Sequence, residues 1–576
     1  MSLRALSMAG LTHYRGLHAL VVAGVAVAVA VLAGALLVGA SVRASLRDLA
    51  LARLGHTELV VSSTGFFRAA LAEEVRSPEI AAVVPLLAVP AAVTHDDSRR
   101  TATRVQVFGI DDRFFAFHGR AAGAPAGREA WVSPGLAAEL GAAPGDNILL
   151  RVAKPTDVPL SNLQGRRDDA SQRVRLTIAR VVERADLGEF SLLPAQGPAL
   201  SLFVPLSRLQ QDLGIIGSAN VLLVRMAPPV RDAIADVQAA VGAAAELEDI
   251  GLKVRTDASG TVSILESRTG LLPDTMAQAA AARARDQGGA PTGALTYLAN
   301  AIRANGREIP YSLIAATSLP AQPGRSFEPT DATLPPISLN EWAADDLGVT
   351  PGDRVEVDYF LWSDQDGLRS RTTAFTFAGV VSMKGPGGDA TLTPEYPGIT
   401  DAGNVTSWDP PFPVDMSKVR KKDEEYWDRW RAAPKAFIPL EVGQSLWPSA
   451  FGSLSSLRTS YLANWPPVTD VSSVLTVRHV RDEALAAAAG TTDFGEYFIY
   501  FSFFLVFSAL LLAGMFFALG VEQRAKELGL LLAVGYRIRD VRNVLLAEAT
   551  VLASVGTALG LLGAIGYAAL IMHGLR

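Results

Sequence analysis

The sequence predicts an α+β membrane protein with three transmembrane helices and a large two-lobed extracytoplasmic α+β region. Runs without Asp, Glu, Lys or Arg at residues 16–42, 497–521 and 549–572 support the membrane part. Each run exceeds the roughly 20 residues that a helix needs to cross a bilayer. Roughly 450 residues separate the first two runs, enough for two or more domains with their own cores. A pattern that occurs twice among them predicts the two lobes.

The first hydrophobic run is predicted to be an uncleaved transmembrane helix at residues 17–42, after a cytoplasmic N-terminal segment at 1–16. A cleaved signal peptide is the alternative, but its apolar region would span only about 7 to 15 residues. The flanks do not orient this helix, because basic residues stand on both sides of it. These are Arg4 and Arg15 before the run, and Arg43, Arg47 and Arg53 after it.

The loop at residues 522–548 orients the chain. Short loops rich in Lys and Arg stay in the cytoplasm. With this loop inside, the helices at 497–521 and 549–572 place residues 43–493 outside and the N-terminus inside. The sequence therefore predicts a multi-pass protein of the cell (inner) membrane. The basic residues of the loop are Arg524, Lys526, Arg537, Arg539 and Arg542.

Composition limits the partners and the chemistry. The net charge of −6 and the pI near 5.8 argue against nucleic acid as a partner. With no cysteine, the extracytoplasmic region must fold without disulfides, on core burial alone. The mean hydropathy of +0.25 reflects three spans and an Ala-rich exterior rather than a fully embedded protein.

A strand, a helix that ends at Gly, a Pro-Gly-Asp turn and a second strand are predicted twice, near residues 130–155 and 335–360. Similar strands follow both copies, which favours two related lobes at 43–257 and, with a linker, 258–493. A chance recurrence of a common turn is the alternative. The paired positions are Ser133 and Ser338, Gly141 and Gly348, Asp146 and Asp353, then the strands 174–182 and 373–381, and 202–205 and 436–439.

Other segments of the exterior region are less regular. Residues 262–285 are predicted to be helical, with interruptions at Gly270 and Pro273, and a Gly- and Pro-rich surface excursion is expected at 384–413. The charged run 418–431 predicts an exposed amphipathic helix whose aromatic residues pack on the lobe. A ligand-contacting aromatic patch is the alternative reading of Tyr426, Trp427 and Trp430.

Catalytic and nucleotide-binding motifs are absent from the sequence. It contains no His-Glu-x-x-His, no Gly-x-Ser-x-Gly and no phosphate loop, so we expect no enzyme activity, metal or cofactor on this chain. The start of a calcium loop at residues 364–367 has no carboxylate at its twelfth position, where Phe375 stands, and is predicted to be a hairpin turn.

The cytoplasmic loop is predicted to form an elbow of two helices. The first continues from the membrane through residues 522–534 and breaks at Gly535, and the second starts at Arg537 and lies along the membrane surface. A basic anchor for acidic lipid headgroups is one interpretation. Glu548 should pair with an Arg of the loop or lie at the interface. Close helix packing is predicted at Gly556, Gly560 and Gly563.

The elbow resembles the cytoplasmic signature of FtsX-like/MacB-like ABC transporter permeases. Two segments near the N-terminus resemble the corresponding parts of large permeases of this family. The resemblance touches both ends of the chain and the first lobe. The segments are EQRAKELGLLLAVG at 522–535 with Arg537 and LAEA at 546–549, and then LLVGASVRASLR at 36–47 and VQVFGIDDRFF at 105–115.

This resemblance implies a membrane subunit driven by a separate cytoplasmic ABC ATPase, and a second permease subunit in a homo- or heterodimer. It also implies that the elbow is the coupling helix that docks on the ATPase. Leu532 departs from the family, which often has Arg there. The positions that match the family are Glu522, Arg524, Glu527, Gly529, Ala533, Gly535, Arg537 and Glu548.

Two functions follow from the resemblance. The first is export or extraction of a lipoprotein, peptide or amphiphile, which the size of the exterior region favours. The second is signalling that activates an envelope hydrolase, in the manner of FtsX. A family half-unit has four spans, one before the exterior domain and three after it, whereas three are predicted here. We therefore expect a truncated or split permease, and the alternative is a second polypeptide that supplies the missing helix.

Overall fold

The structure is a computed structural model, and it falls into two compact units that are described separately. The helical unit comprises Met1–Gly55, Phe190–Pro198 and Val480–Arg576, and the β unit comprises His56–Glu189 and Ala199–His479. The described residues are 8, 10–121, 123–152, 172–194, 197–228, 232–257, 259–318, 334–363, 367–396, 398–408, 414–460, 471–472, 474–489 and 494–574.

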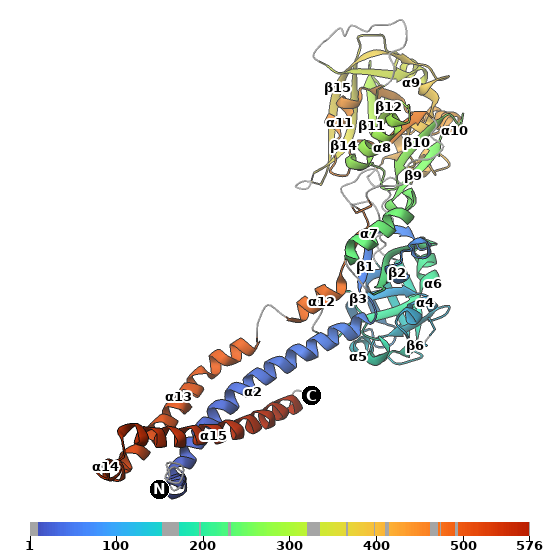
Figure 1. Cartoon of the computed structure of the whole chain (residues 1–576). Helices are drawn as coiled ribbons and strands as arrows, with labels where there is room; N and C mark the ends of the chain where they lie inside the picture. Colours follow the sequence, from blue (N-terminus) through green and yellow to red (C-terminus); the bar gives the residue numbers. More distant parts are fainter. Residues whose placement is uncertain are drawn as a thin grey trace. The chain divides into compact units, whose positions relative to one another are not determined.

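The helical unit consists of long apolar helices. Among the described residues, three helices have the length and composition needed to cross a membrane. α2 packs against both α13 and α15 (Figure 1). Together with the β unit, these helices confirm the predicted α+β membrane protein. The helices are α2 (Arg15–Leu54), α12 (Val480–Ala489), α13 (Phe494–Gln523), α14 (Ala525–Ala533) and α15 (Ile538–Gly574).

Lobe 1 of the β unit is a nine-stranded sheet, counted over the described residues. Six of its strands close into a ring in the order β2-β3-β7-β4-β6-β5, because β5 also pairs with β2. The other three, β8, β1 and β18, extend the sheet from β2. The strands are β1 (Leu59–Arg68), β2 (Ile80–His95), β3 (Thr101–Ile110), β4 (Glu129–Val132), β5 (Asn147–Val152), β6 (Gln172–Val181), β7 (Ser201–Pro205), β8 (Ser218–Met226) and β18 (Thr476–Arg478).

Lobe 2 has the same strand order over its described residues. Its ring runs β11-β12-β16-β13-β15-β14 and closes through the β11–β12 pair, and β17, β10 and β9 extend the sheet from β11. The strands are β9 (Leu252–Thr256), β10 (Val262–Ser267), β11 (Thr292–Ala304), β12 (Arg307–Thr317), β13 (Pro336–Asn340), β14 (Arg354–Ser363), β15 (Gly367–Val381), β16 (Ala436–Ile438) and β17 (Ser456–Ser460).

The repeated unit has the same local geometry in both lobes. The helices α5 (Pro134–Leu140) and α9 (Glu341–Leu347) end at Gly141 and Gly348, with φ of 64° and 63°. In the turns that follow, the amide of Gly145 donates to Ile178 O at 2.7 Å, and that of Gly352 donates to Phe377 O at 2.9 Å. Both turn glycines have φ of 100°, which disfavours a side chain. The predicted repeat is confirmed.

Alternating burial along the strands fills each ring with apolar side chains, as in β5, where every second residue is buried. Helices cover the sheets around these cores (Figure 1). Besides α5 and α9, they are α3 (Leu71–Glu74), α4 (Asp112–Phe117), α6 (Leu206–Leu213), α7 (Ala233–Ala244), α8 (Asp274–Asp286), α10 (Lys421–Trp430) and α11 (Leu440–Leu446).

Two predictions about lobe 2 were wrong. Residues 262–285 are not one helix, because β10 occupies the first part and pairs with β9 and β17, and α8 begins only after Pro273. The segment 384–413 is more than a surface excursion, since its described part places Tyr396, Ile399 and Trp408 in an apolar cluster. Tyr396 lies outside helices and strands, Ile399 lies in a turn and Trp408 follows a 3-10 helix, so no periodic pattern predicts their burial.

Two other expectations concern the same lobe. Tyr426 and Trp427 of α10 are buried against the lobe, which confirms the packing role predicted for them. The predicted hairpin at 364–367 includes residues 364–366, which lie outside the described part. On either side of them, Ser363 pairs with Gly367 in the β14–β15 ladder.

Sheet membership crosses the boundary predicted at residues 257 and 258. β9 precedes that boundary but pairs with β10 of lobe 2. β18 follows it but pairs with β1 of lobe 1, through Val60 and Arg478. The chain therefore leaves the helical unit into β1 after α2 and returns to it from β18 before α12. These two strands are neighbours in one sheet.

Candidate functional site

The elbow begins with a break at Arg524. α13 ends at Gln523, Arg524 has φ of −93° and ψ of 4°, and α14 runs over Ala525–Ala533. The helix predicted to continue through residues 522–534 is therefore interrupted. The amide of Arg524 donates to Val521 O at 3.2 Å, which tightens the last turn before α14 starts.

Arg524 is held by a buried ion pair with Glu548 of α15. Its Nη1 lies 2.5 Å from Glu548 Oε2, and its Nη2 lies 3.3 Å from Oε1. Glu548 is 1% exposed and Arg524 is 7% exposed, so the pair is shielded by protein. A buried charge without a partner is costly, and the expected pairing of Glu548 with an Arg of the loop is confirmed.

Two residues that precede α2 complete this cluster. The Tyr14 hydroxyl donates to Glu527 Oε1 at 2.7 Å, which raises the pKa of Tyr14, and the Arg524 guanidinium lies 5.1 Å from the centre of the Tyr14 ring. A Cβ on Gly10 would lie 2.7 Å from Arg524 Nη2, so any larger residue there would have to displace the side chains of the ion pair. We call Gly10, Tyr14, Arg524, Glu527 and Glu548 the elbow cluster.

Neither Gly10 nor Tyr14 could be predicted from the sequence as part of this cluster. Tyr14 and Glu527 are 513 positions apart, and no local pattern links them. A single tyrosine beside the first span reads as an interfacial aromatic residue, which is common in membrane proteins.

The second half of the elbow turns at Gly535. Its φ of 100° is a backbone conformation that favours glycine, and the amide of Tyr536 donates to Leu531 O at 3.1 Å across the turn. The predicted break at Gly535 is confirmed. The predicted surface helix is wrong, however, because α15 runs without interruption from Ile538 to Gly574. Residues 538–548 are the first turns of the third span. The continuous helix places Glu548 within hydrogen-bond distance of Arg524.

The remaining predicted coupling residues lie on the outside of the helical unit. Glu522, Gly529, Ala533 and Arg537 are exposed, as is the cluster residue Glu527. Large apolar side chains are exposed beside them, and we call them the elbow surface. They are Leu530 (66% exposed), Val534 (72%) and Ile538 (74%).

Small residues bring α15 against α2. A Cβ on Gly556 would lie 3.0 Å from Val22 O, and one on Gly560 would lie 2.7 Å from Ala26 O, so neither position accepts a side chain without a shift of the backbone. Gly563 is in ordinary contact range, with 3.5 Å to the Ala30 Cβ. A second close contact, not predicted from the sequence, lies on the other side of α2, where Gly24 faces Ala509 and Ala513 of α13.

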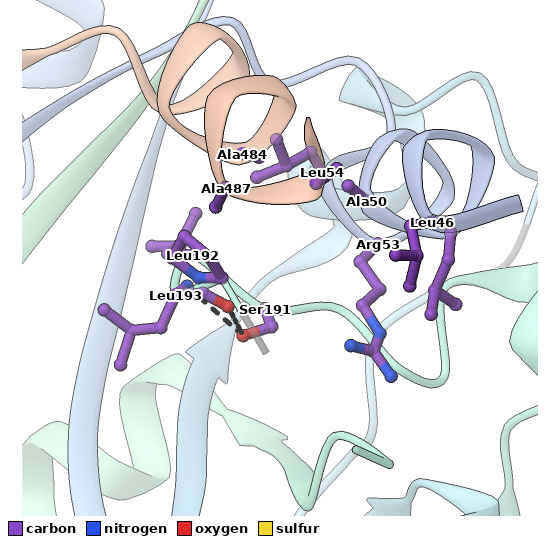
Figure 2. A pocket seen from close by; sticks show the side chains of 12 residues that line it. Leu46, Ala50, Arg53, Leu54, Ser191, Leu192, Leu193, Ala484 and Ala487 are labelled. Atoms are coloured by element: carbon purple, nitrogen blue, oxygen red, sulfur yellow. Dashed lines mark hydrogen bonds between the residues drawn. The ribbon is translucent and has the colours of Figure 1, made fainter. Parts of the chain in front are cut away.

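An apolar cavity of about 170 Å³ lies at the other end of α2. Figure 2 shows side chains from three segments around it: α2, the loop after Glu189, and α12. Arg53 is 5% exposed, and its Nη2 donates to Gly197 O at 2.7 Å. In the loop, the Ser191 hydroxyl donates to Leu193 O at 3.0 Å. The lining residues include Leu46, Ala50, Leu54, Leu192, Leu193, Ala484 and Ala487.

Comparison with known proteins gives matches in two regions. The MacB-like periplasmic core domain family matches residues 19–244, which include α2 and most strands of lobe 1. The FtsX-like permease C-terminal family matches residues 499–575, which include the elbow and α15. No curated protein matches this chain.

Two solved structures resemble part of the chain. The periplasmic region of MacB from Actinobacillus actinomycetemcomitans is 11% identical, with a TM-score of 0.22, over 34% of this chain and 86% of that one. A domain of a protein assigned as a permease, from Porphyromonas gingivalis, is 14% identical, with a TM-score of 0.21, over the same shares. Family membership rests on the two sequence matches, which include the residues of the elbow. The chain belongs to the FtsX-like/MacB-like family of ABC transporter permeases.

Proposed function

We propose that this chain, as an ABC permease subunit, couples ATP hydrolysis by a separate cytoplasmic ATPase to motion of its β lobes. The observation that carries this proposal is the elbow surface. Leu530, Val534 and Ile538 expose large apolar side chains next to charged residues, on a segment that the elbow cluster ties to the rest of the helical unit. Exposed apolar side chains rimmed by charge are typical of a docking site for another protein.

The elbow cluster supplies a rigid connection from this surface to the membrane helices. Arg524 joins the start of α14 to α15 through Glu548, and Glu527 joins α14 to the start of α2 through Tyr14. A displacement of α14 on ATPase closure therefore pulls on both helices together. Since α2 and α15 pack closely at Gly556 and Gly560, they move as one element.

The chain connections then deliver this motion to lobe 1. α2 leads directly into β1, and α12 follows directly after β18. Because β1 and β18 are paired strands, the two connections act on the same edge of one sheet. Movement of the helices would thus displace the paired strands β1 and β18 together, because each strand is connected to one of the moving helices.

For the substrate, the cavity beside Arg53 supports an amphiphile, such as a lipoprotein or a peptide with an apolar group. Its lining is apolar except for Arg53 and Ser191, and an apolar cavity of about 150 Å³ accepts a group as large as benzene. We place residues 43–493 outside the inner membrane, so the cavity would lie on the extracytoplasmic side. A dimer with a second permease subunit, surrounded by membrane lipid, is part of this proposal.

The test is ATPase coupling in proteoliposomes that contain the permease and the cytoplasmic ABC ATPase proposed as its partner. Leu530→Asp places a charge on the elbow surface, where the side chain has no packing role, and should abolish co-purification of the ATPase. Ile216→Asp is the matched control, because Ile216 is 81% exposed in lobe 1 and lies outside the elbow. If Leu530→Asp retained ATPase binding and stimulation, the elbow would be only a lipid anchor.

Activation of an envelope hydrolase is the alternative use of the same motion. It predicts that ATPase activity depends on the hydrolase and is indifferent to amphiphiles. Substitution of the cavity residue Leu192 by Asp separates the two, since it should impair amphiphile-stimulated ATPase activity only if the cavity holds the cargo.

A further inference from the structure

We propose that His95, Asp97 and Asp146 of lobe 1 bind one divalent transition-metal ion of the Zn²⁺ type. A nitrogen of His95 and a carboxylate oxygen from each acid lie within 4.8 Å of one another. His95 and Asp97 belong to the hairpin between β2 and β3, and Asp146 is the acid of the first Pro-Gly-Asp turn. This inference does not depend on the ATPase-coupled function.

The imidazole of His95 is the strongest observation. His95 is 4% exposed, and its Nε2 is buried without a hydrogen-bond partner, 3.3 Å from Asp146 Oδ2. Its Nδ1 lies 2.8 Å from the Ser98 hydroxyl, which is also placed to donate to Leu140 O at 3.1 Å. The Ser98 amide also lies 3.4 Å from Nδ1 and is placed to donate to it, so Ser98 holds this side of the ring through its hydroxyl and its backbone.

Metal binding requires the tautomer with the ring proton on Nδ1, in which Nε2 directs a lone pair at a carboxylate oxygen of Asp146. Two acceptors at 3.3 Å repel each other unless a positive charge lies between them. A metal ion supplies this positive charge, and it can bind both groups because neutral imidazole and carboxylate are common metal ligands. With the ring proton on Nδ1, the Ser98 hydroxyl would accept it and hold the ring orientation, as a hydrogen-bond acceptor commonly does behind a metal-bound histidine.

Asp146 is held in place by the turn itself. The amide of Ala143 donates to its Oδ2 at 2.8 Å, and the amide of Ile178 donates to its backbone oxygen at 2.8 Å. Its carboxylate is half-buried, whereas Asp97 is exposed at the tip of the hairpin. Two of the three ligands are therefore preorganised, and the third can adjust to the ion from the solvent side.

Lobe 2 provides an internal comparison. There the turn acid Asp353 accepts from the amide of Thr350 at 2.8 Å, as Asp146 accepts from Ala143. Its other neighbour is the hairpin residue Asn305, whose Nδ2 donates to Asp353 Oδ2 at 3.2 Å. An amide group thus satisfies the turn acid in lobe 2. In lobe 1 the imidazole of His95, whose Nε2 makes no hydrogen bond, takes the place of Asn305, and Asp97 of the hairpin adds a second carboxylate.

The ligand set favours a transition metal over Ca²⁺ or Mg²⁺. Those two ions prefer oxygen ligands alone, whereas imidazole is a common ligand of Zn²⁺, Cu²⁺ and Ni²⁺. The chain has no cysteine that would compete for the ion. A bound ion would clip the tip of the β2–β3 hairpin to the turn between α5 and β5, which are separate segments of the ring.

The test is Zn²⁺ titration of the full chain, purified in detergent without a polyhistidine tag, against a chromophoric chelator. We expect one tight site in the wild type and at least a tenfold weaker affinity in His95→Asn. That variant copies the Asn305–Asp353 pair, so it should fold, and its melting temperature without metal should match the wild type. Asp353→Asn in lobe 2 and His118→Gln, which removes one member of the His56–His118 pair, should leave the affinity unchanged.

Co²⁺ provides a second readout, because its visible absorption reports ligand number and geometry. The wild type should show one saturable spectrum that His95→Asn lacks. Equal Zn²⁺ affinity in the wild type and in His95→Asn would overturn the proposal. So would the absence of a tight site in the wild type, since His95 and Asp146 would then contact each other directly with no ion between them.

Discussion

Arg524 and Glu548 form a buried ion pair, with 2.5 Å between Nη1 and Oε2, that joins the break after α13 to the first turns of α15. The backbone at Gly10 lies so close to both side chains that a Cβ there would contact Glu548 Oε1 and Arg524 Nη2. All three membrane helices therefore meet at one charged contact next to the elbow surface. In a chain whose spans are otherwise apolar, this contact sets the position of the elbow.

We predict that the pair behaves as a unit in a double-mutant cycle. Arg524→Gln and Glu548→Gln should each lower stability by about 3–5 kcal/mol, because each leaves a buried charge without its partner. The double variant should lose no more than the larger single loss. Unfolding by SDS in mixed micelles measures these differences, and additive losses would show that the two residues act independently.

Close packing of α15 on α2 predicts a position-specific effect of side-chain size. Gly560→Val places atoms where the Ala26 carbonyl oxygen is 2.7 Å from the Cβ, and should cost about 1–3 kcal/mol. Gly566→Val is the control, because nothing lies within 4 Å of that Cβ. The melting temperature in detergent should fall for Gly560→Val only. Equal effects at both positions would point to helix propensity rather than packing.

Membrane topology can be tested by cysteine labelling, since the chain has no cysteine of its own. Ile216→Cys in lobe 1 should react with an impermeant maleimide in intact spheroplasts. Lys526→Cys in α14 should react only after lysis. Both side chains are exposed, so access through the membrane decides the outcome. The reverse labelling pattern would refute the cytoplasmic placement of the elbow.

The buried Lys435 of lobe 2 predicts a dependence of stability on pH. Burial lowers the pKa of Lys435 from 10.5 to about 8, although Asp423 lies 3.6 Å from its Nζ. Below pH 8 both the folded and the unfolded chain carry this proton. Between pH 8 and 10.5 the unfolded chain binds more protons, so the free energy of unfolding rises with pH, by at most about 3 kcal/mol.

Melting curves of the wild type and Lys435→Met between pH 7.5 and 10 measure this contribution. Other groups titrate in the same range, so the readout is the difference between the two proteins. The wild type should gain melting temperature relative to Lys435→Met as the pH rises. Lys384→Met, which removes an exposed lysine of the same lobe, should run parallel to the wild type. A constant difference for Lys435→Met would contradict the lowered pKa.

The spans and the repeat could be predicted because their signals are local. An uncharged run longer than a bilayer crossing specifies a membrane helix on its own, and a Gly-terminated helix followed by Pro-Gly-Asp specifies its own turn. For the same reason the break at Gly535 could be predicted. The break at Arg524 could not be predicted, because Arg524 pairs with Glu548, which lies 24 positions away in the sequence.

The sequence by itself determined three spans, the paired turns at Asp146 and Asp353 and the residues of the elbow. Only the tertiary structure decided that each lobe closes into a ring of the same strand order, and that Gly10 and Tyr14 complete the elbow cluster. It also decided that His95 faces Asp146, whereas Asn305 faces Asp353. These are contacts between segments far apart in the chain, and their energies depend on distance and burial, which no local pattern of residues encodes.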